Sequence, residues 1–142
     1  MAQKAKDVMT MNPSVVTPDT PVQEAARLMQ TEDTGVLPVV EGQGVRRPVG
    51  VITDRDLAIR VVAEGRTSAT VREVMTAGVR TCKQDDDLKD VMQAMASEQV
   101  RRIPIVDDSG NLVGIVSQAD IVLEADDKQA EKTIEKISQP AR

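Results

Sequence analysis

Two short stretches of the chain place a hydroxyl three residues ahead of a carboxylate: Thr53–Asp56 and Ser117–Asp120. Each follows an apolar run, so we expect the hydroxyl at the N-cap of a helix and the carboxylate at its third position. One interpretation is structural, because such a pair caps free backbone N–H groups and favours the positive end of the helix. The other interpretation is a binding site, because the helix start and the hydroxyl can hold a phosphate. The carboxylate can then accept hydrogen bonds from ribose hydroxyls.

Both stretches belong to an internal repeat. Asp7–Thr10 recurs 66 residues later as Glu73–Thr76, and the same spacing continues without a gap to Gly44 and Gly110. Beyond these glycines Val45–Pro48 is two residues longer than its counterpart, which predicts an insertion in a surface turn. A lone unit of about 60 residues has a marginal core, so each repeat is expected to need the other.

The elements that position these residues follow the same order in both repeats. A short strand, Pro13–Thr17 in the first repeat, leads into a helix with apolar residues on one face. Thr20 or Asp19 is expected to cap this helix, with Pro21 in its first turn. Two apolar strands separated by turn residues then form a hairpin, and a second helix opens at each hydroxyl. We therefore expect domains at 6–65 and 71–124, a linker at 66–70, and a polar helix or tail at 125–142.

Composition limits the possible functions. The chain has 142 residues and no Phe, Tyr, Trp or His, so its core must be aliphatic and no aromatic platform can stack a base. A formal net charge of −5 argues against a nucleic-acid or anionic-membrane surface, since phosphates select clustered Lys and Arg. No leader or membrane-spanning run is apparent, and a single cysteine fits a reducing compartment, so a cytoplasmic location is expected.

Other chemical groups are better explained by structure. Asp85–Asp87 leads into a predicted helix, where acidic residues favour the helix dipole, so no metal site is expected. Cys82 lies in a predicted strand without a histidine to activate it and is expected to be a buried structural thiol. No catalytic residue, enzyme activity or required cofactor is predicted.

Three motifs recur in order in both halves of Lys6–Glu124: Val-Met-Thr, hydrophobic-Pro-hydrophobic, and Gly-hydrophobic-x-Thr/Ser-x-x-Asp. With them the chain resembles a tandem pair of CBS domains, the module named after cystathionine β-synthase. It is similar to the small stand-alone pairs of bacteria and archaea. The resemblance implies an α+β fold, in which two pseudo-symmetric βαββα units pack through their sheets into one CBS pair.

The resemblance also implies roles for the residues named above. Thr53 and Ser117 correspond to phosphate contacts, and Asp56 and Asp120 to ribose contacts. The aliphatic wall around the base is expected near the first strand and before the hydrophobic-Pro motif. By repeat, the residues at these places are Ser14, Gly35 and Val36, and then Arg80, Arg101 and Arg102.

The arginines make the two expected sites unequal. In CBS pairs a basic residue before the hydrophobic-Pro motif commonly reaches phosphates held by the other domain. Arg101 and Arg102 would then serve the Thr53 site, with Arg55 nearby, and the Ser117 site would be weaker or take a less charged ligand. Alternatively Arg80, Arg101 and Arg102 serve the Ser117 site, or they form surface ion pairs.

By this resemblance the chain is an adenine-nucleotide sensor for AMP, ADP or ATP. Binding would change the geometry between the CBS domains or within a dimer and so signal to an unknown effector protein. A homodimer is expected, since isologous pairs are the commonest closed assembly. The alternatives are an S-adenosylmethionine sensor, or a structural dimerisation module that binds no ligand.

Overall fold

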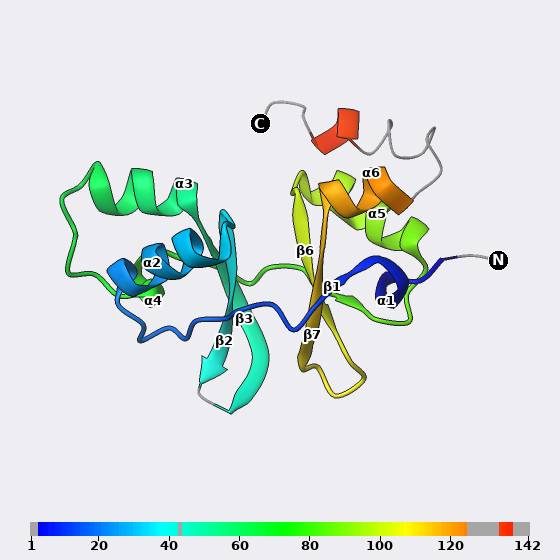
Figure 1. Ribbon diagram of the computed structural model, residues 1–142, viewed down its shortest axis with the longest axis horizontal. Helices are drawn as coiled ribbons and strands as arrows, with labels where there is room; N and C mark the ends of the chain where they lie inside the picture. Colours follow the sequence, from blue (N-terminus) through cyan, green and yellow to red (C-terminus); the bar gives the residue numbers. More distant parts are fainter. Residues whose placement is uncertain (1–2, 43, 125–133, 138–142) are drawn as a thin grey trace. The chain divides into compact units, whose positions relative to one another are not determined.

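The computed structural model describes residues 3–42, 44–124 and 134–137, and these form two compact units (Figure 1). The Thr53 unit consists of Pro13–Val79 together with Gly110–Leu112. The Ser117 unit consists of Met1–Asn12, Arg80–Ser109 and Val113–Arg142. Each unit therefore contains one of the two predicted helix starts.

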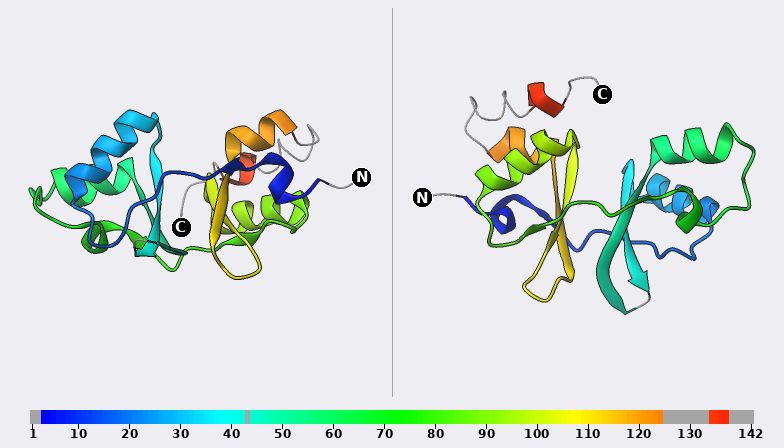
Figure 2. Two further views of the ribbon diagram at one scale, coloured as in Figure 1. Left: turned by 60° about the horizontal axis from the view of Figure 1, so that its bottom comes forward. Right: turned by 180° about the vertical axis from the view of Figure 1, so that it is seen from behind.

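The Ser117 unit is built on a sheet of four strands in the order β1-β7-β6-β5. Strand β1 is antiparallel to β7, whereas β5 is parallel to β6. Helices α5 and α6 lie together on one face of this sheet (Figures 1 and 2). The elements are α1 (Ala5–Val8), β1 (Thr10–Met11), β5 (Cys82–Lys83), α5 (Leu88–Glu98), β6 (Arg102–Val106), β7 (Leu112–Ser117) and α6 (Gln118–Glu124). The run from β5 to α6 confirms the predicted βαββα order.

The Thr53 unit repeats this plan on a sheet in the order β2-β3-β4. Its elements are α2 (Val22–Glu32), β2 (Val36–Gly42), β3 (Val45–Thr53), α3 (Asp54–Leu57), the π-helix η1 (Ala58–Val62), α4 (Val71–Val74) and β4 (Thr76–Ala77). The predicted strand Pro13–Thr17 is reduced to one parallel bridge between Val16 and Val39. The prolines that flank Val16 have no N–H to donate, which limits the length of this strand.

Two arms are exchanged between the repeats. The N-terminal arm, Lys4–Met11, lies at the start of the first repeat but belongs to the Ser117 unit. The middle arm, Thr70–Ala77, lies at the start of the second repeat but belongs to the Thr53 unit. Their contacts are duplicated: the N–H of Ala5 donates to the Asp86 carbonyl at 2.9 Å, and that of Val71 to the Thr20 carbonyl at 2.8 Å. The compact units and the sequence repeats 6–65 and 71–124 therefore divide the chain at different points.

An ion pair holds each arm in the same way. Lys6 Nζ lies 2.9 Å from Asp85 Oδ1, and Arg72 Nη2 lies 2.8 Å from Asp19 Oδ1. Both pairs are exposed to solvent, so each contributes little to stability alone. Apolar residues at equivalent positions of the two arms are buried in the two cores, and these are Ala5, Val8, Val71 and Val74. Each core thus depends on side chains that the other repeat supplies.

The start of α2 differs from the prediction. Pro21 is the N-cap residue, with an extended backbone, and no side-chain bond caps the helix. The predicted caps are occupied elsewhere: Thr20 Oγ1 accepts from the N–H of Thr17 at 3.0 Å, and Asp19 pairs with Arg72. The prediction that Thr20 or Asp19 caps α2 was wrong, because these side chains hold the preceding turn and the middle arm.

The two-residue insertion also differs from the prediction. Val45–Pro48 lies inside β3, not in a surface turn. The ladder between β2 and β3 shifts register twice, between Val39 and Val40 and between Val40 and Gly42. Such irregularities absorb extra residues in a strand. The insertion therefore lengthens the hairpin and brings Arg46 into the strand.

The second helix of the first repeat begins at Thr53 and ends before Gly65, whose φ is +66°, as predicted. Its π-helical turn, η1, was not predicted. No helix in the described residues is long and apolar enough to cross a membrane. Of the predicted polar tail, 125–133 and 138–142 lie outside the described residues. Residues 134–137 form a helical turn in which Ile137 is buried in the Ser117 core, so the tail is not wholly solvated.

Candidate functional site

The Thr53 helix start forms the predicted capping arrangement. Thr53 Oγ1 accepts from the N–H of Asp56 at 3.1 Å, and Asp56 Oδ2 accepts from the N–H of Thr53 at 3.0 Å. Asp56 is the one buried polar residue among the described residues, with 9% of its surface exposed. The structural interpretation of this motif is therefore confirmed. An ionised carboxylate has about four acceptor positions, so capping alone leaves Asp56 with acceptor capacity.

The Ser117 helix start has the same geometry. The N–H of Ser117 donates to Asp120 Oδ2 at 2.8 Å, and the N–H of Asp120 donates to Ser117 Oγ at 3.2 Å. Ser117 Oγ also lies 2.9 Å from Asp120 Oδ2, to which it donates its proton. The carboxylate is more exposed than that of Asp56. Both helix starts are thus fixed locally before any ligand is considered.

In each unit the second residue before the hydrophobic-Pro motif lies against the helix start of its own unit. The N–H of Asp54 donates to the Gly35 carbonyl at 2.9 Å, and the N–H of Gln118 donates to the Arg101 carbonyl at 2.8 Å. A Cβ added to Gly35 would come within 2.8 Å of Oδ2 at the end of the Asp54 side chain, so that side chain would have to move. Val36 follows it and pairs with Thr53 in the ladder between β2 and β3. The structure thus brings these predicted site residues together within each unit.

A cavity of about 580 Å³ opens beside the Ser117 helix start. Arg101 and Arg102 line it together with Ser117, and both arginines are exposed to solvent. The remaining wall comes from α6, where Gln118, Ala119 and Val122 line the same cavity. The sequence interpretation did not single out these three residues, although their position on the helix that opens at Ser117 was the signal for them. Within the Ser117 unit, Arg101 and Arg102 therefore share one cavity with Ser117.

The other predicted residues occupy different places. Ser14 Oγ donates to Glu32 Oε1 at 2.8 Å, at the end of α2. Arg80 is exposed and is not among the residues that line the cavity at Ser117. Arg55 is exposed on the first turn of α3, where its N–H donates to the side chain of the preceding residue, Asp54. Arg101 and Arg102 are thus the predicted arginines that line the cavity at Ser117.

The remaining reactive groups have structural roles. Cys82 is a buried free thiol, and burial raises its pKa, which disfavours the nucleophilic thiolate. Within Asp85–Asp87, Asp85 pairs with Lys6, and Asp86 accepts from the N–H of Lys83 at 2.8 Å. In the described part of the chain, no group of three or more His, Cys, Asp or Glu side chains is placed to hold a metal ion.

Comparison with known proteins gives a consistent result. The family model described as CBS domain matches the chain twice, at residues 5–63 and 71–127. The CBS domain-containing protein YhcV of Bacillus subtilis (strain 168) is 45% identical over 119 residues, which cover 83% of this chain and 82% of that protein.

Two solved structures with bound ligands have the same fold. The CBS domain pair of protein MJ0100, in complex with 5′-methylthioadenosine and S-adenosyl-L-methionine, matches with a TM-score of 0.75 and 28% identity. The match covers 87% of this chain and 95% of that one. CBSX2 in complex with AMP matches with a TM-score of 0.72 and 26% identity, over 93% of this chain and 98% of that one.

Proposed function

The chain belongs to the CBS domain family, and on this premise we propose that it is a regulatory sensor that binds an adenine nucleotide of the AMP, ADP or ATP class. The observation that carries the proposal is the cavity at Ser117, which combines two arginines with a capped helix start. AMP, 5′-methylthioadenosine and S-adenosylmethionine, which are bound in the similar structures, all contain adenosine. The shared adenosine supports an adenosine-containing ligand, and the residues of this chain discriminate between such ligands.

The arginines favour a ligand that carries phosphate. A guanidinium is always charged and can form two parallel hydrogen bonds with phosphate oxygens. Arg101 and Arg102 line the same cavity as Ser117 and bring this capacity to it. 5′-Methylthioadenosine has no anionic group for them, and the sulfonium of S-adenosylmethionine is repelled by them. We therefore place AMP, ADP and ATP ahead of these two relatives.

Ribose and base need different surroundings. The Asp120 carboxylate, already oriented by Ser117, can accept hydrogen bonds from the ribose hydroxyls. Ala119 and Val122 supply apolar surface on the cavity wall, and about half of the Val122 surface is exposed. Burial of apolar area against the base contributes about 25 cal/mol per Å². The site thus needs no aromatic ring to hold adenine.

The Thr53 helix start is proposed as a second nucleotide site of different strength. It has the same hydroxyl and carboxylate but has Gly35 and Val36 where the other repeat has Arg101 and Arg102. If the arginines serve their own unit, the Ser117 site is the stronger one for phosphates. If they act crosswise, the Thr53 site is the stronger one. The two assignments predict different results in a double-mutant experiment, which is set out in the Discussion.

We further propose that the chain acts as a cytoplasmic homodimer without enzyme activity and transmits ligand binding to an effector protein. Transmission requires two conformations in equilibrium. A ligand shifts that equilibrium only by the difference between its affinities for the two conformations. The competing function is an interaction module that binds no nucleotide.

Binding to purified protein tests this proposal. With no Trp, Tyr or Phe the protein scarcely absorbs at 280 nm, so an absorption band at 260 nm in nucleic-acid-free protein reports co-purified nucleotide. Calorimetry with AMP, ADP, ATP and S-adenosylmethionine then gives the order of affinity, which we expect to follow the number of phosphates. Asp120→Asn should weaken binding of every adenosine ligand, whereas Asp108→Asn, in an exposed turn, should not. A flat spectrum and no heat with any of the four ligands would favour the interaction module.

A further inference from the structure

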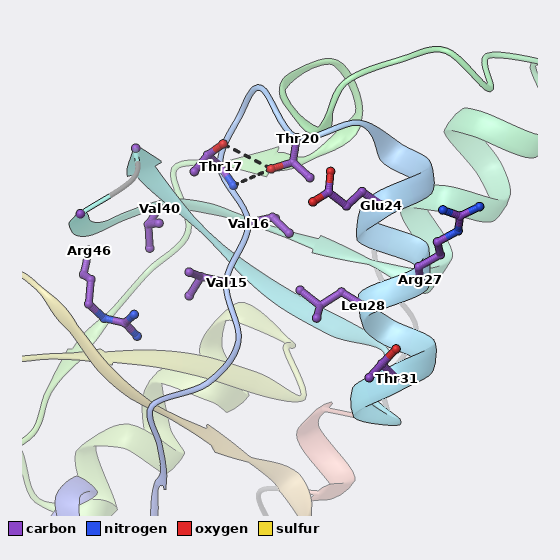
Figure 3. A pocket seen from close by; sticks show the side chains of 12 residues that line it. Val15, Val16, Thr17, Thr20, Glu24, Arg27, Leu28, Thr31, Val40 and Arg46 are labelled. Carbon is purple, nitrogen blue, oxygen red and sulfur yellow. Dashed lines mark hydrogen bonds between the residues drawn. The ribbon is translucent and has the colours of Figure 1, made fainter.

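A second cavity, the α2 pocket, lies wholly within the Thr53 unit and shares no lining residue with either helix start (Figure 3). Its volume is about 620 Å³. Its apolar wall includes Val15, Leu28 and Val40, which come from the segment before α2, from α2 and from β2. Arg27 and Arg46 line the same pocket. A cavity with aliphatic walls and two cationic side chains is suited to an amphipathic anion.

Arg46 has hydrogen-bonding capacity that the described part of the protein leaves unused. Its Nε donates to the Leu112 carbonyl at 3.2 Å, which fixes the position of the guanidinium. Its Nη2 is buried and has no hydrogen-bond partner among the described residues. Because Nη2 is closed to solvent, a ligand in the pocket would meet Arg46 through the part of its side chain that lines the cavity. A guanidinium forms its strongest hydrogen bonds with a carboxylate or another oxyanion.

The two arginines of the pocket have no arginine counterpart in the second repeat. At the position of Arg27 the second repeat has Gln93, and Arg46 lies in Val45–Pro48, where the second repeat has only Asn111 and Leu112. The insertion is accommodated by the two register shifts in the ladder of β2 and β3. Both cationic groups of the pocket are therefore departures from the repeated plan and are not needed to form it.

We propose that the α2 pocket binds a small aliphatic monocarboxylate, with its carboxylate on Arg46 and its alkyl chain against Val15, Leu28 and Val40. Glu24 lines the pocket as its one acidic residue, which leaves a balance of one positive charge. That balance favours a single anionic group over a polyanion. Thr17 and Thr20, whose hydroxyl oxygens lie 3.3 Å apart, provide polar groups at one end of the pocket (Figure 3).

Titration of the full chain, labelled with ¹⁵N, with hexanoate tests this site by NMR. We expect hexanoate to shift the amide signals of Thr17, Thr20, Gly42 and Gly44, which line the pocket. Hexanol probes the alkyl chain without a charge, and inorganic phosphate probes an anion without an alkyl chain. Each should bind at least about tenfold more weakly, since a charge-assisted hydrogen bond or several buried CH₂ groups are lost.

Two arginines of the insertion form a matched pair of variants. Arg46→Met keeps an unbranched apolar stem but removes the guanidinium and its charge, and it should weaken hexanoate about tenfold. Arg47→Met is the control, because Arg47 is exposed and contacts Glu41 at 3.4 Å. Arg27→Gln, which introduces the residue of the second repeat, should weaken binding severalfold and is compatible with the helix. Unperturbed signals elsewhere in the spectrum confirm that each variant is folded.

Four results would overturn the proposal. The first is that hexanoate shifts none of the four amides, and the second is that Arg46→Met and Arg47→Met weaken its binding equally. The third is displacement of hexanoate by AMP in competition at the same amides, which would make the pocket part of the nucleotide site. Equal binding of phosphate and hexanoate would contradict the ligand class, because the aliphatic wall would then contribute nothing. The test is independent of nucleotide binding, so failure of one proposal leaves the other standing.

Discussion

Arg102→Met is the variant that separates the two assignments of the arginines. Arg102 lines the cavity at Ser117 and is exposed there, so its charge is partly screened by water before a ligand binds. A charge-assisted hydrogen bond contributes about 1.5–3 kcal/mol, and about 1.4 kcal/mol corresponds to a tenfold change in Kd. Because of the exposure we expect the lower end of this range. Arg102→Met should therefore weaken ATP about tenfold and leave adenosine unchanged.

The assay is calorimetry at low salt, where the Debye length exceeds about 10 Å. Arg102→Met is combined in turn with Asp120→Asn and with Asp56→Asn, which retain an oxygen to cap each helix. If Arg102 serves the Ser117 site, it loses its effect when Asp120 is replaced and keeps it when Asp56 is replaced. Arg80→Met is the control, since Arg80 is exposed in the same unit but outside the cavity.

The reverse pattern would refute this reasoning. If the effect of Arg102→Met disappears with Asp56→Asn and persists with Asp120→Asn, the arginine acts on the Thr53 site. If Arg80→Met weakens ATP as much as Arg102→Met does, general surface charge explains the result, and the cavity has no special role.

Two further predictions concern the exchanged arms. Gly50→Ala would place a Cβ against the backbone carbonyl of Thr76 in β4, so it should destabilise the protein by about 1–3 kcal/mol. Gly42→Ala, with open space around it, should change the free energy of unfolding by less than about 0.5 kcal/mol, and urea unfolding followed by circular dichroism compares the two. The hydrogen bond and charge of Lys6 lower the pKa of Asp85, so the stabilisation by this pair is present above the unfolded pKa of Asp85 and is lost as pH falls through the folded value. Asp85 likewise raises the pKa of Lys6, so the stabilisation is lost again as pH rises through the folded pKa of Lys6. The urea midpoints of Lys6→Met and of the wild type should therefore converge at both low and high pH.

Local patterns in the sequence were sufficient for the elements and for the chemistry of the helix starts. A hydroxyl and a carboxylate three residues apart meet on the first turn of any helix, so the caps at Thr53 and Ser117 could be predicted without a tertiary structure. The absence of aromatic residues determined an aliphatic core, and the described residues confirm it. The repeat of 66 residues predicted two similar units, because equal patterns form equal elements.

Tertiary structure alone decided which repeat completes each core and which residues surround each site. The N-terminal arm meets residues about 80 positions away, and either repeat offers it an equivalent acceptor, so no local pattern distinguishes the two. Arg46 lines a pocket because the two extra residues lie in the strand β3, where register shifts accommodate them, and not in the surface turn that the sequence predicted. Arg101 came to lie at Ser117 because the N–H of Gln118 bonds to its carbonyl. Sequence spacing fixes neighbours along a helix or strand, whereas pairing between distant segments depends on how the whole core packs.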